Sequence, residues 1–293
     1  MSRSNSLKFA LLLSASAVLS ACSQSNDVTN SGVDKGALQL AVSSRSEEAK
    51  TRDAVRHPEA TLEFFKVAPG MTVAEALPGG GWYSNVLARY LGTQGTLYGV
   101  NYDDDMWARF GFFDEDGIKA RIASTGKFGT VVSGLTDNGI KTAGYTFATM
   151  PESINGTVDR VLFIRALHNL NRFEEEAGTL TASLKAAHRV LKKDGLVGVV
   201  QHHLAEDAAD AGADGSRGYL KKSHLISAFE KAGFELAASS DINANPKDQP
   251  GEAGIVWRLP PNYVGTRDDE AKKAEVDAIG ESNRMTLLFK KVG

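Results

Sequence analysis

The sequence is short of cysteine, of net charge and of long apolar runs. Its 293 residues include a single cysteine, Cys22, so no disulfide can form within the chain. The formal net charge is −3, from 33 basic and 36 acidic residues, and no basic face is evident along the chain. We therefore expect no nucleic acid among its partners. A hydrophobic share of 42% provides for an ordinary core in one large domain or two small ones.

The longest apolar run near the N-terminus, residues 9–18, is too short to span a bilayer as a mature helix. It follows Arg3 and Lys8 and precedes Leu19-Ser20-Ala21-Cys22, an order typical of a secretory signal. These last four residues resemble the lipobox of bacterial lipoproteins, which implies cleavage before Cys22 and lipidation of its thiol and amine. In that class, Ser23 in place of Asp implies the outer membrane. We predict export to the periplasmic face of the envelope, with the membrane contacted only through the lipid anchor. A signal peptide without lipidation is the alternative.

The chain divides into three predicted parts: a signal peptide with lipobox (1–22), a flexible tether (23–35) and a folded domain (36–293). The tether is rich in Ser, Asn and Asp and has little to bury. In the domain, short apolar runs alternate with helical patterns, which indicates a mainly parallel sheet covered on both faces. The predicted strands are 72–77, 96–100, 145–149, 158–164, 195–202, 234–239 and 285–290, and the predicted helices include 38–54, 59–66, 82–91 and 223–232. Residues 243–278, rich in Pro, Gly and charge, are expected to form a long surface excursion.

The segment from Val73 to Tyr83 is the most informative in the chain. A short apolar run ends in Glu75, and Pro78, Gly79, Gly80 and Gly81 follow before a helical pattern begins. Glycine lets the backbone approach a ligand closely and adopt positive φ, and the free N–H groups of the next helix face whatever lies over the turn. A carboxylate at the end of the strand offers a partner to an amino group or a sulfonium. The pattern predicts a site for a nucleotide-type cofactor; a glycine-rich turn without a ligand is the alternative.

This segment resembles motif I of the class I S-adenosylmethionine-dependent methyltransferases, an acid followed by glycines at every second position. Glu75, Gly79 and Gly81 fall on that pattern, and Leu77 stands where its first glycine would be. With Gly70-Met71-Thr72-Val73 before it, the string is similar to a branch of predicted bacterial methyltransferases. The resemblance implies a doubly wound α/β fold, a Rossmann-like and mostly parallel seven-stranded sheet with its last strand antiparallel, and S-adenosylmethionine as cofactor.

The resemblance also implies further cofactor contacts. Ligands of an open parallel sheet bind beyond the carboxyl ends of the strands, where the loops after successive strands converge. Asn101 occupies the place of the family's ribose-binding acid, and an amide bonds a diol more weakly than a carboxylate does. The family's acid near the adenine is missing, and Met150 lies in that region. The expected cofactor-binding residues are therefore Glu75, Pro78, Gly79, Gly80, Gly81, Asn101, Tyr102, Met150 and Arg165.

The stretch Arg165-Ala166-Leu167-His168-Asn169, after the fourth strand, is the predicted catalytic edge. Histidine is suited to remove a proton near neutral pH, so His168 is the first candidate for a base and His203, across the cleft, the second. His168 could instead bond backbone in its loop, since methyl transfer needs mainly in-line positioning. Adjacent His202 and His203 on an extended chain face opposite ways, so we expect no metal site there.

The function that these patterns favour is methyl transfer from S-adenosylmethionine to an unidentified small-molecule acceptor. One alternative is an envelope binding protein that keeps the fold without transferase activity, which Leu77 and the two missing acids would suit. The other is a nicotinamide-dependent oxidoreductase, because residues 79–84 loosely match a dinucleotide fingerprint. Against this, Glu75 has no role in such a site and no Tyr-x-x-x-Lys pair is present.

Overall fold

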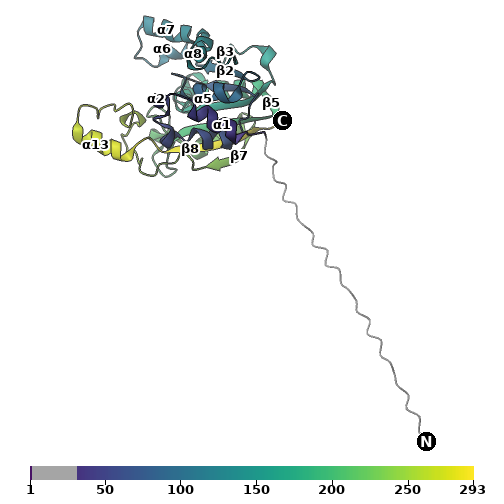
Figure 1. The fold of residues 1–293 in the computed structure, drawn as a ribbon. Coiled ribbons are helices and arrows are strands. Elements are labelled where there is room, and N and C mark those ends of the chain that lie inside the picture. Colours follow the sequence, from purple (N-terminus) through teal and green to yellow (C-terminus); the bar gives the residue numbers. More distant parts are fainter. Residues whose placement is uncertain (2–31) are drawn as a thin grey trace. The chain divides into compact units, whose positions relative to one another are not determined.

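A computed structural model describes residue 1 and residues 32–293 (Figure 1). The predicted signal peptide, Cys22 and most of the predicted tether lie outside these residues. From Gly32 onward the chain forms one compact unit. Its first helix begins at Lys35, at the end of the predicted tether, because the side chain of Asp34 accepts a hydrogen bond from the N–H of Ala37 and caps it. None of the described helices is long and apolar enough to cross a membrane.

The centre of this unit is a mixed sheet of eight strands. Seven follow the order β3-β2-β1-β4-β5-β8-β7, and the two-residue β6 pairs with β5 beside this path. The pairs from β3 to β5 are parallel, whereas β8 is antiparallel to both β5 and β7. The strands are β1 (Thr72–Ala76), β2 (Thr96–Asn101), β3 (Lys141–Thr146), β4 (Val158–Ile164), β5 (Leu191–Leu204), β6 (Leu220–Lys221), β7 (Phe234–Ser240) and β8 (Arg284–Lys291). This confirms the predicted doubly wound, Rossmann-like sheet and its antiparallel last strand; β6 is an addition.

Helices cover both faces of the sheet. They are α1 (Lys35–Ser43), α2 (Glu47–Lys50), α3 (Asp53–Arg56), α4 (Pro58–Phe64), α5 (Trp82–Leu91), α6 (Met106–Arg109), α7 (Glu115–Gly126), α8 (Phe128–Leu135), α9 (Leu167–Arg172), α10 (Glu174–Ala177), α11 (Thr179–Val190), α12 (Lys222–Lys231) and α13 (Glu270–Ile279). Successive strand residues point to opposite faces, so Leu97 of β2 joins a core with α1, α4, α5 and α8, while Val100 joins one with α6, α9, α11 and α12.

Two predicted elements end earlier than the sequence pattern suggests. The third strand stops at Thr146, because Thr149 turns back on it: the hydroxyl of Thr149 accepts from the N–H of Thr146 at 2.8 Å. The predicted helix 38–54 is broken into α1, α2 and α3, since Ser46 is extended and its side chain caps α2 by accepting from the N–H of Ala49.

The predicted surface excursion, residues 243–278, is partly buried. Asp248 is only 3% exposed. It accepts hydrogen bonds from the hydroxyl of Tyr219 at 2.9 Å, from Arg258 at 2.6 Å and from the N–H of Asn283 at 2.9 Å. A buried carboxylate with three donors holds its segment to the body of the protein. Most of the segment is exposed, as a surface excursion between the last two strands is expected to be, but Asp248 anchors it.

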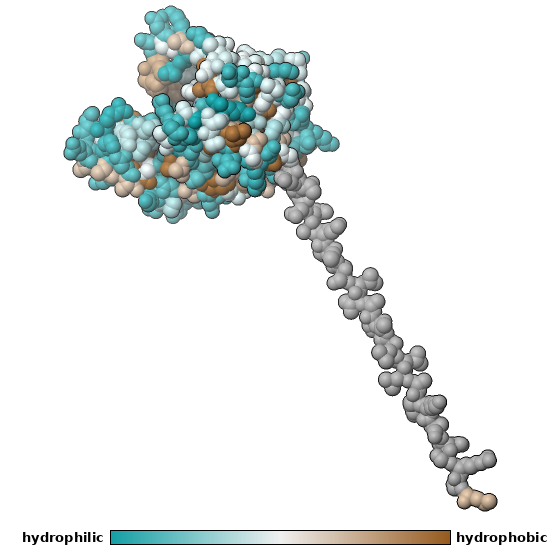
Figure 2. Space-filling model, in the orientation of Figure 1, coloured by the Kyte–Doolittle hydropathy of each residue, from teal (hydrophilic) through white to brown (hydrophobic). Residues whose placement is uncertain are grey.

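Two parts of this unit project next to each other in Figure 1, one with α6, α7 and α8 and the other with α13. The space-filling view in Figure 2 shows the surface hollowed between them. Residues of α7 and α8 line one cavity of the protein, and residues 256–262, before α13, line another.

Candidate functional site

Two adjoining cavities lie at the carboxyl ends of the central strands, where open parallel sheets bind ligands. The larger has a volume of about 680 Å³ and the smaller about 480 Å³, both within the usual range of small-molecule sites. They share five wall residues, which follow β1 and β4: Leu77, Pro78, Gly79, Arg165 and Asn169. Two ligands bound side by side would therefore meet over these residues.

The glycine turn between β1 and α5 forms the common wall. Gly79 and Gly81 have φ of 57° and 77°, a conformation that favours glycine. A Cβ on Gly81 would also lie 2.9 Å from Cδ1 of Leu135, whereas one on Gly80 would meet nothing within 4 Å. The turn thus needs glycine at 79 and 81 for its own shape, and Gly80 leaves space over the smaller cavity.

Leu77 and Arg165 occupy equivalent places at the ends of the neighbouring strands β1 and β4. Both are non-glycine residues with positive φ, 53° for Leu77 and 58° for Arg165. This conformation costs an L-residue about 1–2 kcal/mol. Such strain gathers at functional sites, and both residues line both cavities. Leu77 thus has a left-handed backbone conformation, which favours glycine, at the place where the resemblance predicts the first glycine of motif I.

Glu75 lies beneath the turn rather than in the wall of either cavity. Its carboxylate is 3% exposed and accepts a hydrogen bond from the hydroxyl of Ser84, in the first turn of α5, at 2.5 Å. Burial raises the pKa of Glu75 to about 7, although the hydrogen bonds from Ser84 act in the opposite direction. The structure therefore gives Glu75 a different place from the predicted cofactor contact. It ties the start of α5 to the end of β1 and so positions the glycine turn.

The other predicted cofactor residues divide into those that line a cavity and one that does not. Asn101 and Tyr102 line the larger cavity with Pro78, Gly79, Gly81 and Arg165, and Gly80 lines the smaller. Met150 is buried and lines neither, because β3 ends before it. Its predicted contact with the cofactor thus has no support from the cavity walls. The outer wall of the larger cavity comes instead from α7 and α8: Gly117, Ala120, Arg121, Ser124, Thr125, Phe128 and Val131.

Hydrogen bonds hold the polar residues of the larger cavity in place. The side-chain amide of Asn101 donates to the hydroxyl of Thr125 at 3.2 Å, and its oxygen accepts from the N–H of Tyr102 at 2.9 Å. The Tyr102 hydroxyl accepts from the side-chain amide of Asn169 at 2.8 Å, and burial raises the pKa of Tyr102. Tyr102 thus stays neutral, and the cavity offers an amide where the family has a carboxylate.

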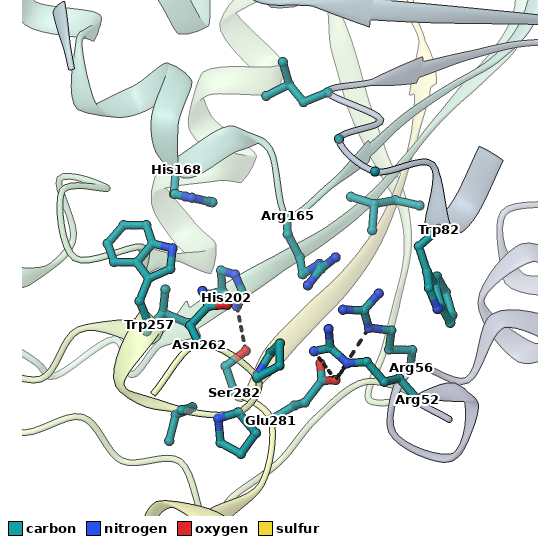
Figure 3. A pocket seen from close by; sticks show the side chains of 18 of the residues that line it. Arg52, Arg56, Trp82, Arg165, His168, His202, Trp257, Asn262, Glu281 and Ser282 are labelled. Atoms are coloured by element: carbon teal, nitrogen blue, oxygen red, sulfur yellow. Dashed lines mark hydrogen bonds and ion pairs between the residues drawn. The ribbon is translucent and has the colours of Figure 1, made fainter. Parts of the chain in front are cut away.

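His168 lines the smaller cavity at the start of α9 (Figure 3). Burial lowers its pKa to about 4, and the charge of Arg165 adds to this effect. The expectation that it titrates near neutrality is therefore wrong. The side-chain oxygen of Gln201 lies 3.4 Å from Nδ1 of His168 and accepts from its backbone N–H at 3.3 Å. An amide oxygen can only accept, so this contact favours a proton on Nδ1 and leaves Nε2 free to accept one.

His203 does not share this cavity. Alternation along β5 places His202 in the cavity wall and His203 outside it. His202 faces the hydroxyl of Ser282 at 2.6 Å, as Figure 3 shows. The catalytic role predicted for His203 has no geometric basis, and the residue to examine on this strand is His202.

An arginine cluster forms the floor of the smaller cavity (Figure 3). Arg52 donates through Nε to Glu281 at 2.6 Å, Nε of Arg56 lies 3.5 Å from the same carboxylate, and Nη1 of Arg284 lies 3.2 Å from it. Arg165 lies above them and makes no side-chain hydrogen bond or ion pair with any described residue. Burial and the nearby Arg165 lower the pKa of Arg56 to about 9, so this guanidinium remains charged at neutral pH.

Tryptophans complete the walls. Trp82 is sandwiched between cations, with the guanidinium of Arg56 4.6 Å and that of Arg45 5.1 Å from its ring. Trp257 lies on the other side, 5.9 Å from the ring of His168. The residues that the sequence did not point to are Arg52, Arg56, Trp82, His202, Trp257, Glu281 and Ser282. For Arg52 and Arg56, the charged run 45–56 was the available signal in the sequence, but such a run is equally typical of a solvated helix face.

Comparisons with known proteins support the fold. No family model and no curated protein sequence matches the chain. Among solved structures, the geranyl diphosphate C-methyltransferase of Streptomyces coelicolor, in complex with Mg²⁺, geranyl-S-thiolodiphosphate and S-adenosyl-L-homocysteine, is 13% identical, with 89% of this chain and 86% of that one covered and a TM-score of 0.50. An S-adenosylmethionine-dependent methyltransferase of Aquifex aeolicus is 14% identical, with 88% and 99% covered and a TM-score of 0.46. The cyclase SpnF is 16% identical, with 82% of each chain covered and a TM-score of 0.49. The chain therefore has the Rossmann-like fold that S-adenosylmethionine-dependent methyltransferases also have.

Proposed function

We propose that the protein transfers a methyl group from S-adenosylmethionine to a small-molecule acceptor. The observation that carries the proposal is the junction of the two cavities over Leu77, Pro78, Gly79, Arg165 and Asn169. One cavity lies at the glycine turn and the ends of β1 and β2, where this fold binds nucleotide-type ligands, and the other opens beside it. Positioning two ligands in line is the main requirement of methyl transfer.

The residues of the larger cavity suit such a cofactor. The backbone at Gly79 and Gly81 forms a cradle at the N-terminus of the ten-residue helix α5, and the amide of Asn101 is placed to bond hydroxyl groups. Tyr102, Phe128 and Val131 add apolar surface for a base. When bound, S-adenosylmethionine supplies an electrophilic methyl group on a sulfonium. The residues that would hold it are Pro78, Gly79, Gly81, Asn101 and Tyr102.

His168 is the group that can hold a proton in the acceptor cavity. It is neutral at pH 7 because its pKa is about 4, and the contact with Gln201 favours a free Nε2. A base with so low a pKa removes a proton weakly, so positioning contributes more to this site than base catalysis does. Asn169, which lies between the cavities, is fixed by its hydrogen bond to Tyr102.

Calorimetry on the full chain with S-adenosylmethionine, S-adenosylhomocysteine and NAD tests the proposal. We expect both sulfur compounds to bind and NAD not to bind. Asn101→Ala should weaken S-adenosylhomocysteine, because it removes the side-chain amide that lines the larger cavity and is placed to bond hydroxyl groups. Asn262→Ala is the matched control, since Asn262 lines only the smaller cavity. Binding of NAD alone would refute methyl transfer and favour the oxidoreductase.

We also propose that Cys22 is lipidated after export and anchors the protein to the periplasmic face of the envelope, with a small molecule as its other partner. The support is the sequence Leu19-Ser20-Ala21-Cys22 after a short apolar run. Cells fed a fatty-acid analogue should label the wild type, and Cys22→Ala should abolish the label. A wild-type protein that carries no label would refute the anchor.

A further inference from the structure

The floor of the smaller cavity carries an excess of positive charge. Four guanidiniums, those of Arg52, Arg56, Arg165 and Arg284, surround a single carboxylate, Glu281, which leaves three positive charges uncompensated. Three of these arginines, Arg52, Arg56 and Arg165, line the cavity itself. Among the described residues no second carboxylate lines the cavity, so this charge is not neutralised within its wall.

Two of these arginines have few partners for cations that are largely removed from water. Arg56 is 4% exposed; its Nε makes no hydrogen bond, and its ionic contact with Glu281, at 3.5 Å, is shared with Arg52 and Arg284. The side chain of Arg165 makes no hydrogen bond or ion pair among the described residues, and its backbone is held in a strained conformation. Removing a cation from water without pairing it fully is costly, so incompletely paired arginines are rare unless they have a function. Unsatisfied guanidinium donors that face a cavity are a suitable site for an oxyanion.

We propose that the smaller cavity binds an oxyanion, a phosphate or carboxylate group of the methyl acceptor, on Arg52, Arg56 and Arg165. The anion would supply the charge that the protein lacks, and Trp82 and Trp257 would cover the rest of the acceptor. The identification of the anion as part of the methyl acceptor rests on the proposed function. The anion site itself follows from the arginines alone. It assigns the acceptor to the anionic metabolites and excludes neutral amines and cationic compounds.

The carboxylate could come from a second source, the amino-acid part of the cofactor itself. Arg165 lines both cavities and could reach it. Arg52 and Arg56, however, line only the smaller cavity. Arg56 ends α3 and Arg52 precedes this helix, so neither belongs to the glycine turn. A cofactor in the larger cavity would leave these two arginines unpaired. The geometry therefore favours a separate anion.

Inorganic phosphate is the probe for the first test, titrated into the full chain at constant ionic strength and followed by the fluorescence of Trp82 and Trp257. We expect saturable binding that chloride does not reproduce. The titration is repeated with saturating S-adenosylhomocysteine, and phosphate should still bind. If S-adenosylhomocysteine excludes phosphate, the arginines hold the cofactor's own carboxylate and the inference is overturned. Absence of phosphate binding also overturns it. If phosphate binds but S-adenosylhomocysteine does not, the anion site stands and the methyl-transfer proposal fails.

Arg165→Gln is the second test, because this side chain has no partner to lose. We expect phosphate to bind about tenfold to a hundredfold more weakly, the effect of one charged hydrogen bond. Arg165→Lys should recover part of the affinity, since the charge returns without the planar fork. Arg189→Gln, outside both cavities, is the matched control and should bind as the wild type does. Thermal unfolding of Arg165→Gln should be unchanged or raised. Equal phosphate affinity in Arg165→Gln and wild type would overturn the inference.

Discussion

Replacing Glu75 by glutamine should remove a pH dependence from the stability of the protein. Burial raises the pKa of Glu75 from its ordinary 4.5 to about 7, so the folded protein keeps a proton that the unfolded chain releases. Below about pH 4.5 both states are protonated, and the buried carboxyl carries no penalty. Between about pH 4.5 and 7 the free energy of unfolding falls by about 1.4 kcal/mol for each pH unit, or about 3 kcal/mol in all.

Glutamine has the shape of the protonated acid and cannot ionise. The difference in unfolding free energy between Glu75→Gln and the wild type should therefore shift by about 3 kcal/mol in favour of the variant from about pH 4 to pH 8. Urea unfolding followed by tryptophan fluorescence measures it, and the difference cancels the other titrating groups. Ser84→Ala is the control. It removes a hydrogen bond that lowers the pKa of Glu75, so its pH dependence should extend to higher pH. Parallel curves for wild type and Glu75→Gln would refute the buried-acid assignment.

Three further outcomes follow from the site. Gly81→Val should lower the melting temperature, because φ is 77° and the new Cβ would meet Leu135, whereas Gly80→Val should leave it unchanged, because φ is not positive there and the new Cβ meets nothing. Equal melting temperatures for the two variants would contradict this reading of the turn. His168→Ala should lower turnover toward the weak end of the roughly 10²–10⁴-fold range of general bases, and the wild-type rate should show no titration near pH 6.5, because the pKa is about 4. A rate that rises through pH 6.5 and loses this step in His168→Ala would contradict it. Phosphate should tighten the binding of S-adenosylmethionine more than that of S-adenosylhomocysteine. Arg165 lines both cavities, and its positive charge repels the sulfonium, which S-adenosylhomocysteine lacks, until phosphate neutralises it. If calorimetry shows that phosphate changes the affinities for both ligands equally, the result would contradict a coupling of the two cavities through Arg165.

The sheet and the glycine turn were predictable from the sequence because their signals are local. The fourth strand, Val158–Ile164, and the helix Trp82–Leu91 have the predicted bounds, since apolar spacing and flanking turn residues determine them. The position of Asn101 in the wall of the larger cavity follows from strand order alone, because Asn101 ends the second strand. Positive φ at Leu77 was not predictable from residue type, because leucine seldom adopts it.

The smaller cavity could not be predicted, because its walls come from segments far apart in the chain. Arg52 and Glu281 each lie in a polar, charged segment, and nothing local distinguishes them from surface residues. The pKa of His168 was misjudged for the same reason: its value depends on burial by residues that the chain supplies elsewhere, among them Trp257. Met150 was expected beside the cofactor because the third strand was predicted to reach residue 149. The strand ends at Thr146 instead, where the hydroxyl of Thr149 accepts a hydrogen bond from the N–H of Thr146.

The contacts around Glu281 also determine at which stage of synthesis the smaller cavity can form. Arg52 bonds Glu281, and Arg284 donates to the carbonyl of Val55 at 2.6 Å, both across 229 positions of the chain. During synthesis Arg52 emerges 229 positions before Glu281, the carboxylate that it pairs with. Contacts of such long sequence separation form late, after the loop between them has closed. The glycine turn and the first parallel strands can assemble before this point, but the floor of the smaller cavity cannot. A nascent chain that stops before Glu281 would thus lack the floor of the smaller cavity, and anion binding would report that the segment with Glu281 has docked.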